Sequence, residues 1–335
     1  MDILITGGCG FLGSKLARTL LQKGTIRING ESSQPIRKLI LTDLVPPAKD
    51  LQADQRVQFI AGNLRTLLLT EKIMTAEIKA VFHLAAAVSG ECEANFDLGM
   101  ASNFETTRDL LQACRTSQQV PSFIFASSVA VFSSRPGQSW QGIIVDDDTL
   151  PTPQSSYGIQ KYIGEQLVAD FGRKGFIRAR AVRLMTVSVR PGNPNGAASG
   201  FLSGMIREPL AGLKAIVPVD PETPVALASP ARTIEGLIKA AETADSSWGF
   251  LTAMNLPSLR VTVGDMARTL LRLGGPHLAD RLDWKIDPAI VKLVNSWPGE
   301  IAYSRASQLG LTPDLSFDAI VQQYINENPT AIQLR

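Results

Sequence analysis

The chain has 335 residues, 44% hydrophobic and 19% charged, which suits a globular protein with one large and one smaller domain. Its net charge of +2 predicts no basic surface for nucleic acid, and no apolar run reaches the ~18 residues that span a membrane. The first residues enter a strand directly, so we expect a cytoplasmic chain without a secretory signal. Three unpatterned cysteines (Cys9, Cys92, Cys114) predict reduced thiols and no metal site.

A glycine-rich turn opens the chain. The apolar run Ile3 to Ile5 predicts a buried strand, and the apolar spacing from Leu12 to Lys23 predicts a helix. Four glycines stand at the turn and the start of the helix: Gly7, Gly8, Gly10 and Gly13. In a dinucleotide-binding turn, the first allows the sharp bend, Gly10 lets the backbone approach the pyrophosphate, and Gly13 lets the helix pack closely. We therefore expect a dinucleotide at this turn.

Strands and helices then alternate along the chain. After a polar insertion at Gly24–Lys38, strands are expected at residues 39–43, 57–61, 80–84, 122–126 and 180–187, with helices at 103–117 and 157–172. This order predicts an α/β fold of the Rossmann type, a doubly wound parallel sheet with its ligands at the carboxyl ends of the strands. Asp43 ends the second strand, where a carboxylate binds the adenosine ribose and favours NAD over NADP.

Three further features of the sequence have plain structural explanations as well as functional ones. His83 lies inside an apolar strand and is interpreted as a core residue. Two small residues, Ala85 and Ala86, follow Leu84. They allow the backbone to pass close to a cofactor or, alternatively, to a helix. The acidic run Asp146–Asp148 is interpreted as a solvated turn.

The composition changes after residue 187. A loop rich in Pro, Gly and Asn at residues 190–200 and short elements up to about 229 predict a substrate-binding insertion. Helices at 230–243 and 262–273 flank an expected strand at 250–256 that rejoins the sheet. We therefore expect a dinucleotide-binding domain of residues 1–187, rejoined by about 230–262, and a smaller C-terminal substrate-binding domain of 188–229 plus 263–335.

Tyr157 and Lys161 are four residues apart, so both project from one face of a helix. Ser128 stands about thirty residues earlier, at the end of a predicted strand. A tyrosine, with a pKa near ~10, is a poor base near neutral pH unless a cation stabilises its phenolate. Lys161 and the nicotinium supply that charge, so that Tyr157 accepts a substrate proton while Ser128 binds the substrate oxygen. Ser127 is expected to pack or to contact the cofactor.

The opening glycines and the order Ser128, Tyr157, Lys161 resemble the extended short-chain dehydrogenase/reductase family, which includes NAD-dependent epimerases and dehydratases, over about the first 260 residues. The resemblance implies a homodimer formed through helices 103–117 and 157–172. Asn63 stands where the family carries an Asp that accepts from the adenine amino group, and the Asn carbonyl is expected to take over that role. The implied cofactor contacts are Gly7, Gly10, Phe11, Leu12, Gly13, Asp43, Asn63, Leu64, Leu84, Ala85, Ala86, Tyr157, Lys161 and Met185.

Within that family, residues 189–201, residues 203–212 and the insertion Gln34–Arg37 resemble the D-erythronate dehydrogenase subgroup. This implies NAD-dependent oxidation of the C2 hydroxyl of a small sugar acid, although Met185 replaces the subgroup's proline. Arg190 and Arg207 are both candidates to bind the carboxylate. The expected substrate contacts are Ser89, Ser128, Tyr157, Thr186, Arg190 and Arg207. Two alternatives stay open, a nucleotide-sugar epimerase with tightly bound NAD and a non-catalytic NAD(H) sensor; the segment Ser128–Ala130 argues against a dehydratase.

Overall fold

The computed structural model describes residues 1–333 except 71–72, 118, 136–137, 139, 141, 193–198 and 250–251. The middle of the 190–200 loop and the first two residues of the strand expected at 250–256 therefore lie outside the described residues. The chain divides into a first unit of Met1–Ser128, Ser155–Arg183 and Ile234–Met254 and a second unit of Val129–Gln154, Leu184–Thr233 and Asn255–Arg335. Among the helices of the described ranges, none is both long and apolar enough to cross a lipid bilayer.

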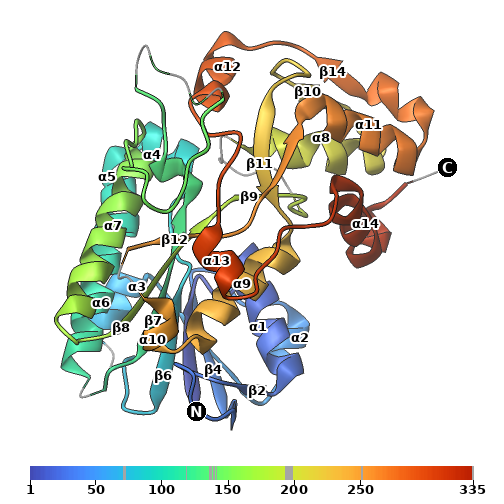
Figure 1. Cartoon of the computed structure of the whole chain (residues 1–335). Coiled ribbons are helices and arrows are strands. Elements are labelled where there is room, and N and C mark those ends of the chain that lie inside the picture. Colours follow the sequence, from blue (N-terminus) through green and yellow to red (C-terminus); the bar gives the residue numbers. More distant parts are fainter. Residues whose placement is uncertain are drawn as a thin grey trace. The chain divides into compact units, whose positions relative to one another are not determined.

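A seven-stranded sheet runs in the order β12-β8-β7-β6-β1-β4-β5 (Figure 1). Strand β1 is buried along its whole length and pairs in parallel with β4 and β6, while β5 and β7 continue the parallel pairing outward. This arrangement confirms the predicted α/β Rossmann-type sheet. The strands are β1 (Asp2–Thr6), β4 (Lys38–Asp43), β5 (Val57–Ala61), β6 (Ile78–His83), β7 (Ser122–Ser128), β8 (Arg178–Leu184) and β12 (Met254–Asn255).

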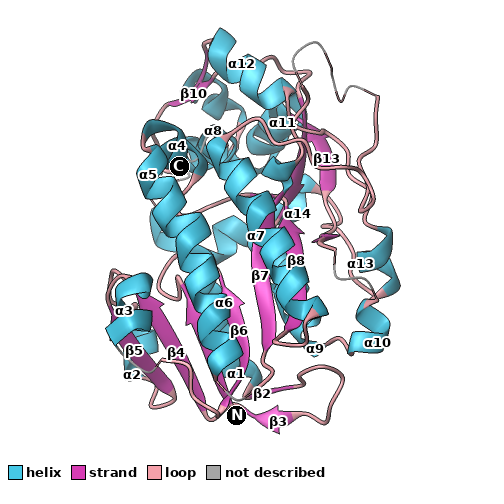
Figure 2. Cartoon of the chain, turned by 90° about the vertical axis from the view of Figure 1, so that its left-hand side faces the viewer, coloured by secondary structure: helices cyan, strands magenta, loops and turns pink. Residues whose placement is uncertain are grey.

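Helices cover both faces of this sheet. Helices α6 and α7 lie side by side on one face (Figure 2), and α1 and α9, joined by an ion pair between Lys23 and Glu242 at 3.0 Å, lie on the other (Figure 1). The polar insertion forms a hairpin of β2 (Thr25–Ile26) and β3 (Gln34–Pro35). The helices are α1 (Phe11–Lys23), α2 (Lys49–Ala53), α3 (Leu64–Thr70), α4 (Ser89–Ala94), α5 (Phe96–Gly99), the π-helix η1 (Met100–Glu105), α6 (Thr106–Thr116), α7 (Ser156–Arg173), α9 (Pro230–Glu242) and α10 (Asp245–Trp248).

The second unit has its own sheet in the order β13-β11-β9 and a core centred on α8 and α11. Its buried side chains include Leu202, Met205, Leu227, Met266 and Leu270. Its strands are β9 (Thr186–Val187), β10 (Ala215–Val217), β11 (Pro224–Ala228), β13 (Leu259–Thr262) and β14 (Leu282–Trp284), and its helices are η2 (Val129–Val131), α8 (Gly200–Leu210), α11 (Val263–Gly274), η3 (Pro276–Arg281), α12 (Pro288–Asn295), α13 (Ser304–Gln308), α14 (Phe317–Glu327) and η4 (Pro329–Ala331).

Two predicted elements are divided in the structure. The strand expected at 180–187 ends at Leu184, and β9 begins at Thr186 and pairs with Leu227 of the other sheet. The buried Met185 packs beside Ala226 and marks this change of sheet. The helix expected at 103–117 begins inside the π-helix η1. Its turns are wider than those of the regular α-helix that the spacing predicts.

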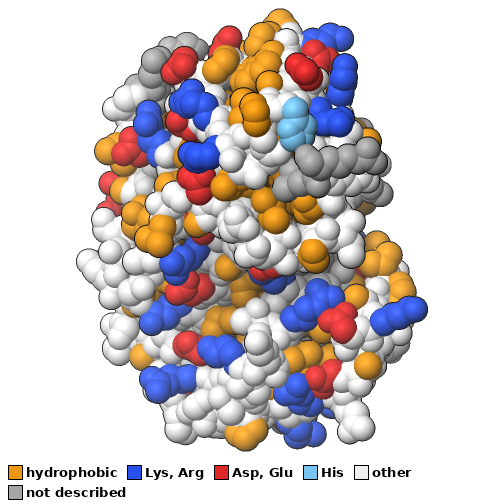
Figure 3. Space-filling model, turned by 90° about the vertical axis from the view of Figure 1, so that its right-hand side faces the viewer, with side chains coloured by type: hydrophobic (Ala, Val, Ile, Leu, Met, Phe, Trp, Pro, Cys, Tyr) orange, Lys and Arg blue, Asp and Glu red, His pale blue; other side chains and the backbone are white. Residues whose placement is uncertain are grey.

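The sequence contains nearly equal numbers of basic and acidic residues, 33 and 31. On the face drawn in Figure 3, Lys and Arg are interspersed with Asp and Glu rather than gathered by sign. Asp146 accepts hydrogen bonds from the backbone of Asp148 and Thr149, which confirms the acidic turn. Its neighbour Asp147 accepts from the backbone of Asn255 at 2.6 Å, a contact within the second unit.

His83 lies inside the first unit, 1% exposed, which confirms its assignment to the core. Its Nδ1 lies 2.7 Å from the Thr6 hydroxyl and its Nε2 lies 3.0 Å from the Thr107 hydroxyl. Burial, assisted by the nearby Lys161 charge, lowers the pKa of His83 from 6.5 to about 3. The histidine is therefore neutral in the folded protein at pH values well above this pKa of about 3.

This buried histidine predicts a loss of stability in acid. The unfolded chain binds a proton at His83 below pH 6.5 and the folded chain does not until about pH 3, so stability falls as the pH is lowered between these values. We expect His83→Gln to be less stable than wild type at pH 7, with the deficit shrinking by about 2 kcal/mol at pH 5. Urea unfolding at both pH values measures this, and a deficit that does not change with pH contradicts it.

Candidate active site

The glycine turn follows β1 and is shaped by its neighbours. Gly7 has a φ of +65°, and a Cβ built on it would lie 2.8 Å from the backbone nitrogen of Ala85. Its N–H donates to the carbonyl of Thr42 on β4 at 2.9 Å. A larger residue at Gly7 would thus be strained and would also push away the loop after β6.

Gly10 and Gly13 differ in what surrounds them. A Cβ on Gly13 would lie 2.1 Å from the carbonyl oxygen of Gly7, so the turn and α1 pack too closely for a side chain. A Cβ on Gly10 would meet only that same oxygen, at 3.4 Å, within the described residues. The protein itself therefore leaves room above Gly10, as the approach of a pyrophosphate requires. Helix α1 also begins without a side-chain cap and without an acidic residue in its first turn.

Asp43 ends β4 next to this turn. Its Oδ2 accepts a hydrogen bond from the backbone of Cys9 at 3.0 Å, and its Oδ1 accepts from the backbone of Leu44 at 2.7 Å. Each carboxylate oxygen can accept a second bond, so the group retains acceptors for hydroxyl donors. Burial and the Asp43 charge raise the pKa of Cys9 to about 11, so this cysteine is a neutral thiol and not a nucleophile.

The loop after β6 is fixed from two sides. The Ala85 N–H donates to the Thr6 hydroxyl at 3.3 Å, close to the glycine turn. In η1, Asn103 accepts from the Ala87 N–H at 2.8 Å and donates to the Ala87 carbonyl at 3.2 Å. No pattern in the sequence distinguishes Asn103 as a residue that fixes this loop. The fixed loop leaves Ala86 exposed, and Leu84 and Ala85 half-buried, at the carboxyl edge of the sheet.

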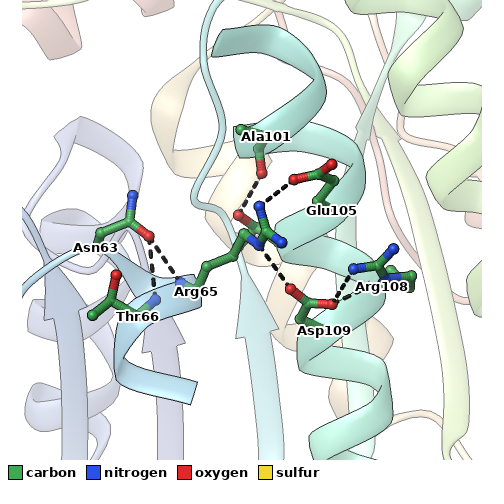
Figure 4. Close-up of polar contacts among 8 residues, drawn as sticks. Asn63, Arg65, Thr66, Ala101, Glu105, Arg108 and Asp109 are labelled. Atoms are coloured by element: carbon green, nitrogen blue, oxygen red, sulfur yellow. Dashed lines mark hydrogen bonds and ion pairs between the residues drawn. The ribbon is translucent and has the colours of Figure 1, made fainter. Parts of the chain in front are cut away.

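Asn63 follows β5 and caps α3 (Figure 4). Its Oδ1 accepts from the backbone nitrogens of Arg65 at 3.0 Å and Thr66 at 3.4 Å. The carbonyl that we expected to accept from adenine is therefore already engaged within the protein. Leu64, the first residue of α3, has a buried side chain.

Tyr157 and Lys161 lie on the first turns of α7. The helix is capped by Ser155, which accepts from the Gly158 N–H at 3.1 Å, and its first N–H donates to Glu93 at 2.6 Å. The Lys161 Nζ lies 5.7 Å from the centre of the Tyr157 ring and donates to the carbonyl of Ala126 on β7 at 2.8 Å. The lysine is thereby held between the tyrosine and the strand end that carries Ser128.

Lys161 is fully buried, and this burial lowers its pKa to about 8, with Cys92 and Glu165 acting in the opposite direction. Glu165, one further turn along α7, forms a buried ion pair with Arg183 at 2.9 Å and accepts a hydrogen bond from the Ser127 hydroxyl. Ser127 therefore packs against α7. The spacing in the sequence could have identified Glu165, because Tyr157, Lys161 and Glu165 follow one another at intervals of four residues.

Arg190 and Arg207 lie together in the second unit. The N–H of Arg190 donates to the Ser203 hydroxyl at 3.0 Å, and its guanidinium donates to the Ser199 hydroxyl at 3.0 Å. Arg207 is buried, donates to the carbonyl of Arg190 at 2.8 Å and pairs with Glu208. Arg207 thus has an acidic partner and holds the backbone of Arg190 in place.

The remaining expected contacts are distributed over both units. Ser89 begins α4 in the first unit and is half-buried, and Phe11 and Leu12 form the half-buried first turn of α1. Met185 is buried in the second unit and Thr186 begins β9 there. The structure therefore brings the glycine turn, Asp43, Asn63, Ser128, Tyr157 and Lys161 into the first unit, and Met185, Thr186, Arg190 and Arg207 into the second.

The sheet is parallel, its glycine turn leaves space at Gly10, the following helix begins without acidic residues, and the next strand ends in an acceptor. Together these features define a dinucleotide-binding protein of the Rossmann type. Residues 3–225 match the model of the NAD dependent epimerase/dehydratase family. The chain belongs to this family and is an NAD-dependent dehydrogenase.

Three similar proteins illustrate this membership. D-Erythronate dehydrogenase of Cupriavidus necator is 44% identical over 98% of both chains. D-Erythronate dehydrogenase of Haemophilus influenzae is 39% identical over 97% of this chain and 99% of its own. Among solved structures, a nucleoside-diphosphate-sugar epimerase from Agrobacterium tumefaciens has a TM-score of 0.88 and 32% identity, over 100% of this chain and 96% of its own.

Proposed function

We propose that this dehydrogenase oxidises the C2 hydroxyl of a small sugar acid, of the D-erythronate type, to the 2-oxo acid. The observation that carries the proposal is the identity of 44% with a D-erythronate dehydrogenase over 98% of both chains, which includes the second unit. Purified protein supplied with NAD and D-erythronate is expected to form NADH, and no NADH with any sugar acid contradicts the proposal.

In the proposed reaction Tyr157, as the phenolate, accepts the proton of the C2 hydroxyl, and the electron pair of that O–H bond forms the second bond of the carbonyl. The C2–H bond breaks at the same time, and its electron pair leaves C2 with the hydrogen as a hydride. NAD, when bound, accepts the hydride. Lys161 stabilises the phenolate through its charge, and its position 5.7 Å from the tyrosine ring centre supports this role. Ser128 donates to the substrate oxygen and orients it.

The substrate carboxylate requires a cation, and we assign this role to Arg190. Its backbone is held by Ser203 and Arg207, and its guanidinium by Ser199, so the side chain is oriented in advance. Arg207 is a positioning residue in this assignment, because its guanidinium is already paired with Glu208.

We expect Arg190→Gln to raise the KM for the sugar acid about 10- to 100-fold with a much smaller change in kcat, since a carboxylate clamp binds ground state and transition state alike. The KM for NAD should not change. Arg268→Gln, which removes an exposed arginine of the second unit, is the matched control. Steady-state kinetics measure this, and an unaltered KM for the acid in Arg190→Gln rejects the assignment.

The second candidate is a nucleotide-sugar epimerase, favoured by the similarity to the Agrobacterium tumefaciens structure. An epimerase retains its NAD and regenerates it in each turnover, so it isomerises a uridine diphosphate sugar without net NADH. The two candidates are separated by incubating the protein with such sugars and analysing the products. We expect no isomer to form.

A further inference from the structure

The side-chain ammonium of Lys161 is buried without an ionic partner. The residue is 4% exposed. Among the residues that the structure describes, its ammonium donates one hydrogen bond, to the Ala126 carbonyl at 2.8 Å, and forms no ion pair. Removal of a charged group from water is unfavourable unless the protein stabilises the charge, which is why burial lowers the pKa of this lysine. The charge on Lys161 therefore depends on the groups that surround it.

Two aromatic rings lie next to this ammonium. Its Nζ lies 5.0 Å from the centre of the Phe125 ring and 5.7 Å from the centre of the Tyr157 ring. The face of an aromatic ring is partially negative and attracts a cation, most strongly where water is excluded. Phe125 is 1% exposed and directly precedes Ala126, so β7 supplies both the ring and the carbonyl that contact the ammonium.

The Phe125 ring fits in this position because α7 carries a glycine opposite it. Helix α7 packs against β7 (Figure 2), and a Cβ built on Gly164 would lie 2.5 Å from Cζ and 3.0 Å from Cε1 of Phe125. Glycine is a poor helix former, so this close approach explains its presence inside α7. The ring of His83 on β6 also packs against Phe125, with the ring centres 5.9 Å apart. Gly164 and His83 together fix the ring beside the lysine.

The titratable groups around Lys161 come from three elements. They are Tyr157 and Glu165 of α7, Cys92 of α4 and His83 of β6. Cys92 and Glu165 favour the charged form of the lysine, and His83 is neutral. All four groups remain when a residue of β7 is changed, so a variant in this strand isolates the contribution of the ring.

We propose that Phe125 is a positioning residue of this dehydrogenase, whose ring, packed against Gly164, holds the Lys161 ammonium charged and in place beside Tyr157. The inference rests on the role proposed above for Lys161, which stabilises the phenolate of Tyr157. Without the ring the charged lysine is less stable. The lysine then loses its proton at a lower pH, and the phenolate loses its electrostatic support.

The test titrates Lys161 directly by NMR, without turnover, in protein that contains isotopically labelled lysine. The signal of Lys161 is the one that is missing from Lys161→Met. We expect Phe125→Leu to lower the pKa of Lys161, with an affinity for the proton about tenfold below that of wild type, because leucine has no negative face. The kcat for the sugar acid should fall by a similar factor near neutral pH.

Phe123→Leu is the matched control. Phe123 lies two residues earlier on β7, is fully buried and also packs against His83, with ring centres 5.9 Å apart. Its substitution should reduce stability to a similar extent and leave the pKa of Lys161 unchanged. A difluorinated phenylalanine in place of Phe125 keeps the shape of the ring and weakens the negative charge of its face. This protein should bind the lysine proton about threefold more weakly, without a cavity.

An unchanged pKa of Lys161 in Phe125→Leu or in the fluorinated protein overturns the inference, as does an equal fall in Phe123→Leu. Gly164→Ala should destabilise the wild-type protein far more than the Phe125→Leu protein, because leucine leaves space for the added methyl group. Equal destabilisation of both proteins also contradicts the inference. Protein in which Lys161 titrates as expected but which oxidises no sugar acid rejects the proposed substrate alone.

Discussion

Replacing Tyr157 with Phe is expected to lower kcat for sugar-acid oxidation by about 10³- to 10⁴-fold, since proton transfer by a positioned general base contributes on this order. The ring and its contact with Lys161 stay, and only the hydroxyl oxygen that accepts the proton as phenolate is lost. Binding of NAD should change far less than kcat, because the contacts at the glycine turn and Asp43 remain in the variant. Stopped-flow measurement of NADH formation gives kcat, and calorimetry gives the affinity.

Tyr162→Phe is the matched control for this variant, because Tyr162 lies on the same helix and is half-buried. It should retain activity close to that of wild type. A Tyr157→Phe protein with wild-type activity would remove Tyr157 from the chemistry. If wild-type protein also bound NAD without oxidising any substrate, the non-catalytic NAD(H) sensor would become the better account.

Alanine substitutions in the glycine turn are expected to separate folding from cofactor binding. Gly13→Ala places a methyl group 2.1 Å from the Gly7 carbonyl oxygen, which the turn cannot accommodate without moving. We expect it to destabilise the protein by about 3 kcal/mol or more. Among the residues that the structure describes, the methyl group of Gly10→Ala meets one atom, at 3.4 Å, so this variant should cost less than about 1 kcal/mol.

The same Gly10→Ala variant should nevertheless bind NAD about 10- to 100-fold more weakly, because its methyl group occupies the space that the pyrophosphate needs. Thermal unfolding and calorimetry on the two variants give both quantities. Unchanged NAD affinity in Gly10→Ala would place the pyrophosphate elsewhere, and wild-type stability in Gly13→Ala would mean that the turn relaxes more easily than its geometry indicates.

Local patterns predicted the sheet and the glycine turn well. An apolar run such as Ile3–Ile5 has few ways to be buried, and the glycine spacing reflects close backbone contacts, which Gly7 and Gly13 indeed make. The division of residues 180–187 at Met185 depends on the pairing of Thr186 with Leu227, 41 residues later in the chain, and no local pattern reports such a partner.

The sequence predicted which residues form the candidate site but not all of their contacts, since these also depend on partners far away in the sequence. Spacing placed Tyr157 and Lys161 on one helix face, but the contact of Lys161 with the Ala126 carbonyl arises only in the folded protein. The same holds for the pairing of Arg207 with Glu208 and for the cap that engages the Asn63 carbonyl. Sequence indicates which residue types are present, whereas hydrogen-bond direction depends on neighbours brought together by folding.

The proposed substrate is tested most directly by the absorbance of NADH in purified protein supplied with NAD and a panel of C3 to C6 sugar acids. The panel includes both enantiomers of erythronate and threonate, and Tyr157→Phe serves as the control. We expect rapid NADH formation with D-erythronate or one close stereoisomer, and none in the variant. If no acid of the panel gave NADH and the protein isomerised a uridine diphosphate sugar instead, the result would contradict the proposal and identify an epimerase.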